Sequence, residues 1–142
     1  MCPAYRAPAP FRTIEQERSV KYLCLAYYDE KAFDALSKAE VDALVSQCPA
    51  YDESLRKSGH LAIQASLGPT RATTTVRPRN GKPSVTDGPF VETKEQVGGF
   101  FIIEARDLNE AIRVASKHPA ANLGEQVGWA IEVRPIEAYE AK

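Results

Sequence analysis

The stretch VKYLCLAYY, residues 20–28, is apolar on both of the faces that a strand alternates between its side chains. One face carries Val20, Tyr22, Cys24 and Ala26, and the other carries Leu23, Leu25 and Tyr27. A strand with this pattern is buried on both sides. The stretch GGFFIIEA, residues 98–105, shows the same pattern. The sequence therefore predicts a sheet that is covered on both of its faces.

Two helical segments follow these strands. Residues 37–59 have apolar positions at helical spacing, with Pro49 expected to kink or divide the helix and Gly59 suited to its end. The stretch DLNE, residues 107–110, matches a capping box and opens a second helix that stops by Pro119.

The remaining apolar stretches predict strands and a hairpin. HLAIQASL, residues 60–67, alternates, with Leu61, Ile63, Ala65 and Leu67 on one face and His60, Ala62, Gln64 and Ser66 on the other. Residues 72–87 predict a hairpin around the two-residue turn Asn80-Gly81. VGWAIEVRPI, residues 127–136, predicts a closing strand.

The order β–α–β–hairpin–β–α–β predicts an α+β fold, a ferredoxin-like antiparallel sheet with two helices on one face. Two helices cover only one face of such a sheet, whereas both long strands are apolar on two faces. A second copy of the same sheet is the economical cover, so the sequence predicts a homodimer.

Length and composition favour one globular domain. The chain has 142 residues, of which 44% are hydrophobic and 26% charged. Residues 20–142 are interpreted as the domain, and residues 1–19, rich in proline, as an N-terminal extension that is poorly ordered or forms a strap. This extension has no apolar core of a secretory signal. A start codon at Val20 would make it an over-long gene prediction.

Charge and cysteine spacing exclude several classes of protein. The formal charge of −1 gives no basic footprint for nucleic acid, and no apolar run approaches the roughly 18 residues of a membrane span. Cys2, Cys24 and Cys48 form no CxxC pair, so neither a zinc site nor a disulfide framework is indicated. Reduced thiols fit a cytoplasmic protein, with Cys24 and Cys48 in the core. No metal or cofactor motif is visible.

The stretch VTDGPFVETKEQVGGFF, residues 85–101, is unusually rich in turn and polar residues. Asp87 is explained either by turn chemistry or by a role as the carboxylate that orients a catalytic histidine. His60, at the start of a predicted strand, is either structural or the partner of Asp87 in a proton-transfer pair. His118, before Pro119, is favoured as a cap at a helix end over a catalytic group.

Other residues of this stretch predict a pocket wall. Thr93 and Gln96 read as a capping box for a one-turn helix that, with Lys94, could face an anion; the alternative is a plain connector. Gly98 and Gly99 allow close approach either of a ligand or of a neighbouring strand. Phe90 would supply an apolar wall.

The stretch DGPFVETKEQVGGFFIIEARDLNEAIRVASKHPAA closely resembles the YCII-related family, in its DGPF-domain branch. KYLCLAYYDE, SGHLAIQASL and EVRPI are similar to its other strands, and the resemblance covers roughly residues 20–137. It implies a dimeric α+β barrel with an active site at the positions of His60 and Asp87. Related enzymes of this architecture catalyse isomerisation or elimination reactions of small acids and lactones. Some bacterial genes of this type lie beside genes for extracytoplasmic-function sigma factors.

Two functions follow as alternatives. The first is an enzyme without cofactor that moves protons on a small carboxylated or lactone substrate, in the manner of an isomerase or lyase, with His60 and Asp87 as its dyad. The second is a non-catalytic ligand-binding or regulatory protein, linked to such a sigma factor, that uses the same pocket. In either case the expected substrate-binding residues are Tyr27, Phe90, Thr93, Lys94, Gly98 and Gly99.

Overall fold

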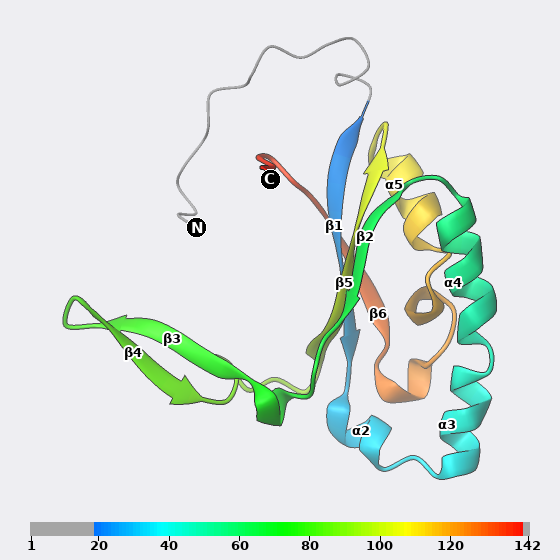
Figure 1. Cartoon of the computed structure of the whole chain (residues 1–142). Helices are drawn as coiled ribbons and strands as arrows, with labels where there is room; N and C mark the ends of the chain where they lie inside the picture. Colours follow the sequence, from blue (N-terminus) through cyan, green and yellow to red (C-terminus); the bar gives the residue numbers. More distant parts are fainter. Residues whose placement is uncertain (1–18, 141–142) are drawn as a thin grey trace.

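Four antiparallel strands form the central sheet in the order β2-β5-β1-β6 (Figure 1). The computed structural model describes residues 19–140, so the expectations for the N-terminal extension lie outside the described residues. The strands are β1 (Val20–Tyr28), β2 (Leu61–Ser66), β5 (Gln96–Ala105) and β6 (Ala130–Pro135). The two strands with two-sided apolar patterns, β1 and β5, are neighbours in the middle of the sheet.

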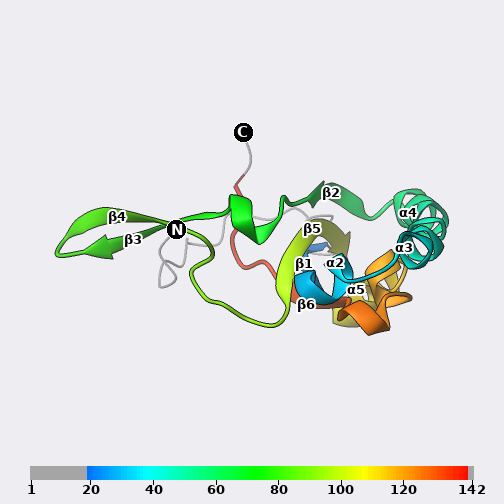
Figure 2. The same ribbon diagram turned by 90° about the horizontal axis from the view of Figure 1, so that it is seen from below.

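The helices lie on one face of this sheet (Figures 1 and 2). They are α3 (Lys38–Val45), α4 (Cys48–Lys57) and α5 (Leu108–Ala115), with a short α2 (Glu30–Asp34) after β1 and two 3₁₀ turns, η2 (Pro119–Ala121) and η3 (Glu125–Val127). The predicted α+β fold of ferredoxin-like type is confirmed. The α2 turn was not predicted.

Local signals set the helix boundaries. Ser37 accepts a hydrogen bond from the backbone of Glu40 at 3.2 Å, and Glu40 accepts one from the backbone of Ser37 at 3.1 Å. Pro49 lies in the first turn of α4, where its missing N–H costs nothing. Gly59 follows α4 with φ of 76°, a left-handed conformation that glycine adopts without strain. The predicted division of this helical segment at Pro49 is confirmed.

The face assignment for β2 was wrong at its first residue. Leu61 pairs with Ile103 on the helix-covered face, and Ile63 pairs with Ile102 on the opposite face, because the register shifts between Leu61 and Ile63. This bulge places Gln64 opposite Phe101 on the helix-covered face. Leu61 therefore packs against the core, whereas the side chain of Ile63 is 48% exposed.

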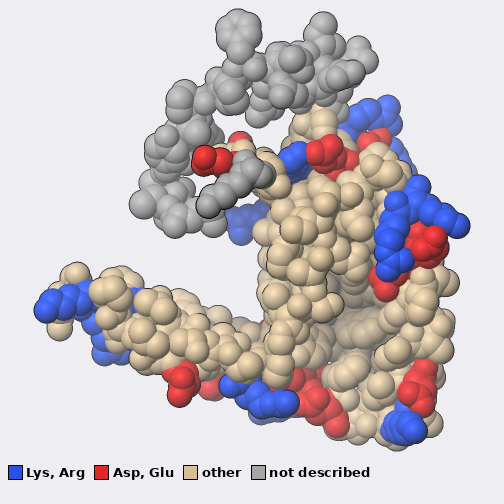
Figure 3. Space-filling view, in the orientation of Figure 1, with Lys and Arg blue, Asp and Glu red and all other residues tan. Residues whose placement is uncertain are grey.

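The predicted hairpin is confirmed and projects away from the sheet (Figures 1 and 2). It consists of β3 (Thr74–Arg79) and β4 (Lys82–Asp87), preceded by the 3₁₀ turn η1 (Thr70–Ala72). Asn80 and Gly81 both have positive φ, 51° and 76°, as the two-residue turn requires. Lysine and arginine side chains gather at the tip of the hairpin (Figure 3).

The core lies between the sheet and the helices. Its fully buried side chains include Leu55 of α4 and Phe101 and Ile103 of β5. Cys24 is also fully buried, as predicted, and burial raises the pKa of its thiol to about 12. The opposite face of the sheet has no helix of the described residues over it. Apolar side chains in two cross-strand rows form this open face: Ile63, Ile102 and Leu23, then Ala65, Phe100 and Leu25.

Candidate functional site

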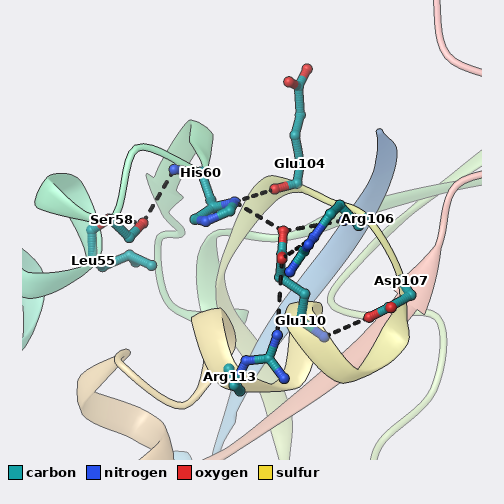
Figure 4. Close-up of polar contacts among 8 residues, drawn as sticks. All are labelled: Leu55, Ser58, His60, Glu104, Arg106, Asp107, Glu110 and Arg113. Atoms are coloured by element: carbon teal, nitrogen blue, oxygen red, sulfur yellow. Dashed lines mark hydrogen bonds and ion pairs between the residues drawn. The ribbon is translucent and has the colours of Figure 1, made fainter. Parts of the chain in front are cut away.

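His60 is held by backbone at the start of β2. Its Nδ1 lies 2.7 Å from the carbonyl oxygen of Glu104, so Nδ1 carries a proton and donates it there. The same nitrogen lies 3.7 Å from the carboxylate of Glu110 (Figure 4). His60 thus joins β2 to the end of β5 and to the first turn of α5.

Glu110 is the centre of this cluster, with its side chain 12% exposed. It accepts hydrogen bonds from Nε of Arg106 at 2.6 Å and from the backbone N–H of Arg106 at 3.2 Å, and Arg113 lies 3.9 Å away (Figure 4). The Arg106 side chain, followed by its backbone N–H and its charge, holds the pKa of Glu110 below its ordinary value of 4.5. The cluster fixes the start of α5 to the sheet.

This cluster predicts a loss of stability in acid. A carboxyl whose folded pKa is lowered stabilises the fold above its unfolded pKa, and this contribution is lost as the pH falls through the folded pKa. We expect Glu110→Gln to lower the free energy of unfolding at pH 7 and to reduce its fall below about pH 4.5. Urea unfolding at pH 7, 5 and 3.5 measures this.

The matched control is Glu53→Gln, because Glu53 is an exposed carboxylate on α4 whose partners Arg56 and Lys57 are also exposed. An equal pH dependence in wild type and Glu110→Gln would show that the Glu110 cluster does not carry the acid response.

Asp87 lies far along the chain path from His60, at the end of the projecting hairpin. It pairs with Thr74 across β3 and β4, and the turn after it is fixed by a hydrogen bond from the Gly88 N–H to the Thr73 carbonyl at 2.7 Å. The whole length of β2 and η1 separates this turn from His60, which precedes β2. The structure does not bring His60 and Asp87 together within one chain, so the dyad stays a prediction that only two subunits could satisfy.

The segment between the hairpin and β5 does not form the predicted one-turn helix. Residues 88–95 contain no helix, and the amide of Gln96 instead donates to the carbonyl and hydroxyl oxygens of Thr93, at 3.2 and 2.9 Å. The polar pair that reads as a capping box therefore closes a loop. Phe90 is 69% exposed and Lys94 is exposed, so no anion site at a helix start exists here.

A cavity of about 370 Å³ lies between the helices and the end of the sheet at which β1 ends and β5 begins. α4 stands away from the sheet edge formed by β2, and the space-filling surface is hollowed between them (Figures 2 and 3). Four polar side chains face it from opposite walls: Cys48 and Asp52 of α4, and Gln64 and Ser66 of β2. The cavity therefore has a polar mouth between an edge strand and a helix.

Aromatic rings form the inner walls. Tyr28 and Phe33 meet edge to face, with ring centroids 6.2 Å apart. The Tyr28 hydroxyl donates to Glu30 at 3.0 Å, and burial together with this bond raises the pKa of Tyr28 to about 12. Trp129 closes the far end of the cavity, against Gly124, where a Cβ would lie 2.3 Å from the indole ring.

Gly98, Gly99 and Tyr27 were predicted to bind substrate, and all three line this cavity. A Cβ on Gly98 would lie 2.8 Å from the Tyr28 ring, and one on Gly99 would lie 2.9 Å from the carbonyl oxygen of Ala65. A larger side chain at either position would clash with neighbouring protein atoms, and this clash accounts for both glycines. The hydroxyl of Tyr27 donates to Glu132 at 2.8 Å.

His118 reaches the cavity from the turn between α5 and η2. Its ring stacks on Phe101, with centroids 4.8 Å apart and planes at 6°. Nδ1 accepts a hydrogen bond from the backbone N–H of Ala120 at 3.1 Å. Burial lowers the pKa of His118, and the charge of Asp52 opposes that effect. The prediction of a cationic cap at the end of α5 is wrong, because His118 instead caps the start of η2 as a hydrogen-bond acceptor.

Cys48 was predicted in the core, but it is half-buried and lines the cavity. Its thiol lies 3.5 Å from the carbonyl oxygen of Leu44. Burial, and then the charge of Asp52, raise the pKa of Cys48. This thiol therefore stays protonated at neutral pH and is a poor nucleophile.

Two further findings concern residues 19–140 as a whole. Within this range, no group of three or more histidine, cysteine or acidic side chains gathers as a metal site. No helix in the same range is long and apolar enough to cross a membrane.

Comparison with known proteins gives one family and one relative. The YCII-related domain model matches residues 20–137. An uncharacterized protein of Rhizobium meliloti (strain 1021) is 37% identical over 119 residues, which cover 84% of this chain and 94% of that protein. The family match runs from the start of β1 to just beyond the end of β6.

Proposed function

Because the chain belongs to the YCII-related domain family, we propose that it binds a small molecule in the cavity beneath α4 and performs acid–base chemistry on it, in the manner of an isomerase or lyase. The observation that carries this proposal is the cavity itself, which combines aromatic walls with a few polar groups. Concave sites of this composition and of about 300–1,000 Å³ are the usual form of small-molecule sites.

The charges around the cavity favour an uncharged ligand. Among the described residues, no lysine or arginine lines it, and Asp52 supplies a negative charge. His118 is held neutral by burial, so it offers no cation for a carboxylate. Of the two substrate classes that the sequence predicts, this environment supports the lactone, or another neutral carbonyl compound, over the carboxylated one.

The proposal includes a homodimer formed through the open face. Leu23 and Leu25 of β1 and Phe100 of β5 stand there with no helix over them, although their strands are the two central ones. Apolar side chains in the middle of a sheet mark an interaction surface, and a two-fold axis lets the same face serve both partners. The cavity opens between β2 and α4, and its lining includes Ala65 and Phe100 of the open face, so a partner on that face lies next to the cavity.

Ligand binding can be measured with Trp129, the single tryptophan of the chain, because it lines the cavity. We expect the neutral bicyclic ketone 2-indanone to change Trp129 fluorescence in a saturable manner, with a dissociation constant of roughly 0.1–1 mM. Ser66→Phe places a ring in the cavity mouth and should weaken binding by at least about tenfold, because it removes the space that the ligand needs.

The matched control is Ala62→Phe, at an exposed position of the same strand that does not line the cavity. It should leave the dissociation constant unchanged within about a factor of two, a change near 0.4 kcal/mol. Equal binding to wild type and Ser66→Phe, or no saturable response from Trp129 for 2-indanone, would contradict the cavity as the ligand site.

The second candidate function is the non-catalytic one, a ligand-binding or regulatory partner linked to an extracytoplasmic-function sigma factor. The inert thiol of Cys48 and the absence of a His60–Asp87 contact within one chain favour it. It shares the cavity with the enzymatic proposal and differs in predicting binding without turnover.

A further inference from the structure

The hydrogen bonds of His118 fix which of its nitrogens carries the proton. Nδ1 accepts the N–H of Ala120, so it cannot itself bear a proton in this conformation. The neutral ring must therefore carry its proton on Nε2. Protonation of Nδ1 would set two donors against each other, which adds to the effect of burial in keeping the ring neutral.

The ring of His118 lines the cavity, and its Nε2–H has no hydrogen-bond partner among residues 19–140. Among residues 19–140, the only buried side-chain nitrogen or oxygen without a hydrogen-bond partner is Nε of Arg77. Nε2 of His118 also has no partner there but is not such a buried atom. Nε2 is consequently open to solvent, and His118 contacts solvent through the cavity that it lines. It offers a fixed neutral donor, because stacking on Phe101 and the bond from Ala120 hold the ring in place.

Asp52 is the complementary group. It lines the same cavity from α4, half-buried, and none of the hydrogen bonds or ion pairs among the described residues uses its carboxylate. Its charge is close enough to act on the imidazole of His118. A carboxylate without other donors is free to accept a proton from a ligand.

We infer that Asp52 and His118 enolise a neutral ketone or lactone: Asp52 removes a hydrogen from the carbon next to the carbonyl, and Nε2–H of His118 stabilises the oxygen that becomes negative. The C–H electron pair becomes the new C=C bond, the carbonyl π pair moves to oxygen, and the proton forms an O–H bond with Asp52. In a β,γ-unsaturated substrate, return of this proton from Asp52 to the γ carbon of the dienolate restores the carbonyl and shifts the C=C bond, which completes an isomerisation with no co-reactant. This inference rests on the proposed cavity function.

A neutral imidazole suits this task. A donor placed where negative charge develops contributes most when it is preorganised and shielded from water. The stacked ring and the backbone bond supply that preorganisation. His60 does not fit this role, because its Nδ1–H is donated to the carbonyl oxygen of Glu104 and the cavity lining does not include His60.

The test is exchange of deuterium from D₂O into 2-indanone, followed by proton NMR in the presence of the full chain. Wild type should incorporate deuterium at the carbons beside the carbonyl faster than buffer alone. Asp52→Asn and His118→Asn should each lower the protein-dependent rate by about 100-fold. Asparagine at position 118 keeps an acceptor for Ala120, so the η2 cap survives.

Asp42→Asn, which changes an exposed acid of α3, is the matched control and should keep the wild-type rate. The Trp129 fluorescence titration separates chemistry from binding, and Asp52→Asn should bind 2-indanone within about threefold of wild type, under 1 kcal/mol. Circular dichroism verifies the fold of each variant, and Asp52→Asn alone remains decisive if His118→Asn unfolds.

Binding of 2-indanone by wild type without exchange above buffer would overturn this inference and leave the binding proposal standing. Exchange that survives in Asp52→Asn would also overturn it. Absence of both binding and exchange would overturn the proposed function together with the inference.

Discussion

Replacing Phe101 by alanine is expected to lower the free energy of unfolding by about 3–5 kcal/mol. Phe101 is fully buried in the centre of β5 and carries the stacked ring of His118. The lost side chain removes apolar burial and leaves a void, because the neighbouring strands hold the backbone in place. His118 loses its support at the same time, so ligand binding in the cavity should weaken as well.

Urea unfolding at one fixed protein concentration measures this effect, because the stability of the proposed dimer depends on concentration. The control is Phe90→Ala, because Phe90 is 69% exposed and its truncation should cost less than about 0.5 kcal/mol. Equal losses for Phe101→Ala and Phe90→Ala would mean that the core between sheet and helices is not the main source of stability.

Replacing Leu25 by glutamate is expected to dissociate the proposed homodimer into monomers. Leu25 lies in the middle of the open face, beside Phe100 of β5. An unpaired charge buried at an interface costs about 3 kcal/mol or more, and two-fold symmetry places it there twice. The dissociation constant should therefore rise by more than about a thousandfold.

Light scattering coupled to gel filtration at micromolar concentration reports the mass of each species. Ile112→Glu is the matched control, because Ile112 is an apolar residue of α5, 48% exposed, on the helix side of the molecule. It should leave the dimer intact. A wild-type protein that is monomeric under these conditions would refute the dimer, and dissociation by Ile112→Glu alone would move the interface to the helices.

The fold was predicted where local signals determine structure. The helix start at Asp107, the division at Pro49 and the turn at Asn80-Gly81 depend on residues a few positions apart, and the structure confirms each. The two-sided patterns of β1 and β5 identified the central strands, because burial on both faces leaves a period-two signal with no polar face.

The errors arose where pairing or spatial context decides. The bulge in β2 depends on its register with β5, so alternation alone wrongly grouped Leu61 with Ile63 on one face. The hydrogen bonds between Thr93 and Gln96 form in a loop, although the same pair of residues is typical of a helix start. Short side chains and amides of this kind serve both conformations.

The site was the least predictable part. His118 and Asp52 are far apart in sequence, and the fold brings both to the walls of one cavity. The sequence did carry a partial signal at His118, as a histidine before a proline at a helix end. That signal favoured a cation at a helix end, whereas the ring caps the start of η2 as an acceptor and lines the cavity.

A crystal structure of the protein soaked with 2-indanone tests most directly where the ligand binds. We predict density between the Trp129 ring and α4, with the ketone oxygen within hydrogen-bonding reach of Nε2 of His118 and a ring carbon facing Asp52. Ligand density on the open face of the sheet, beside His60 or an Asp87 supplied by a second subunit, with the cavity beneath α4 empty, would contradict this account.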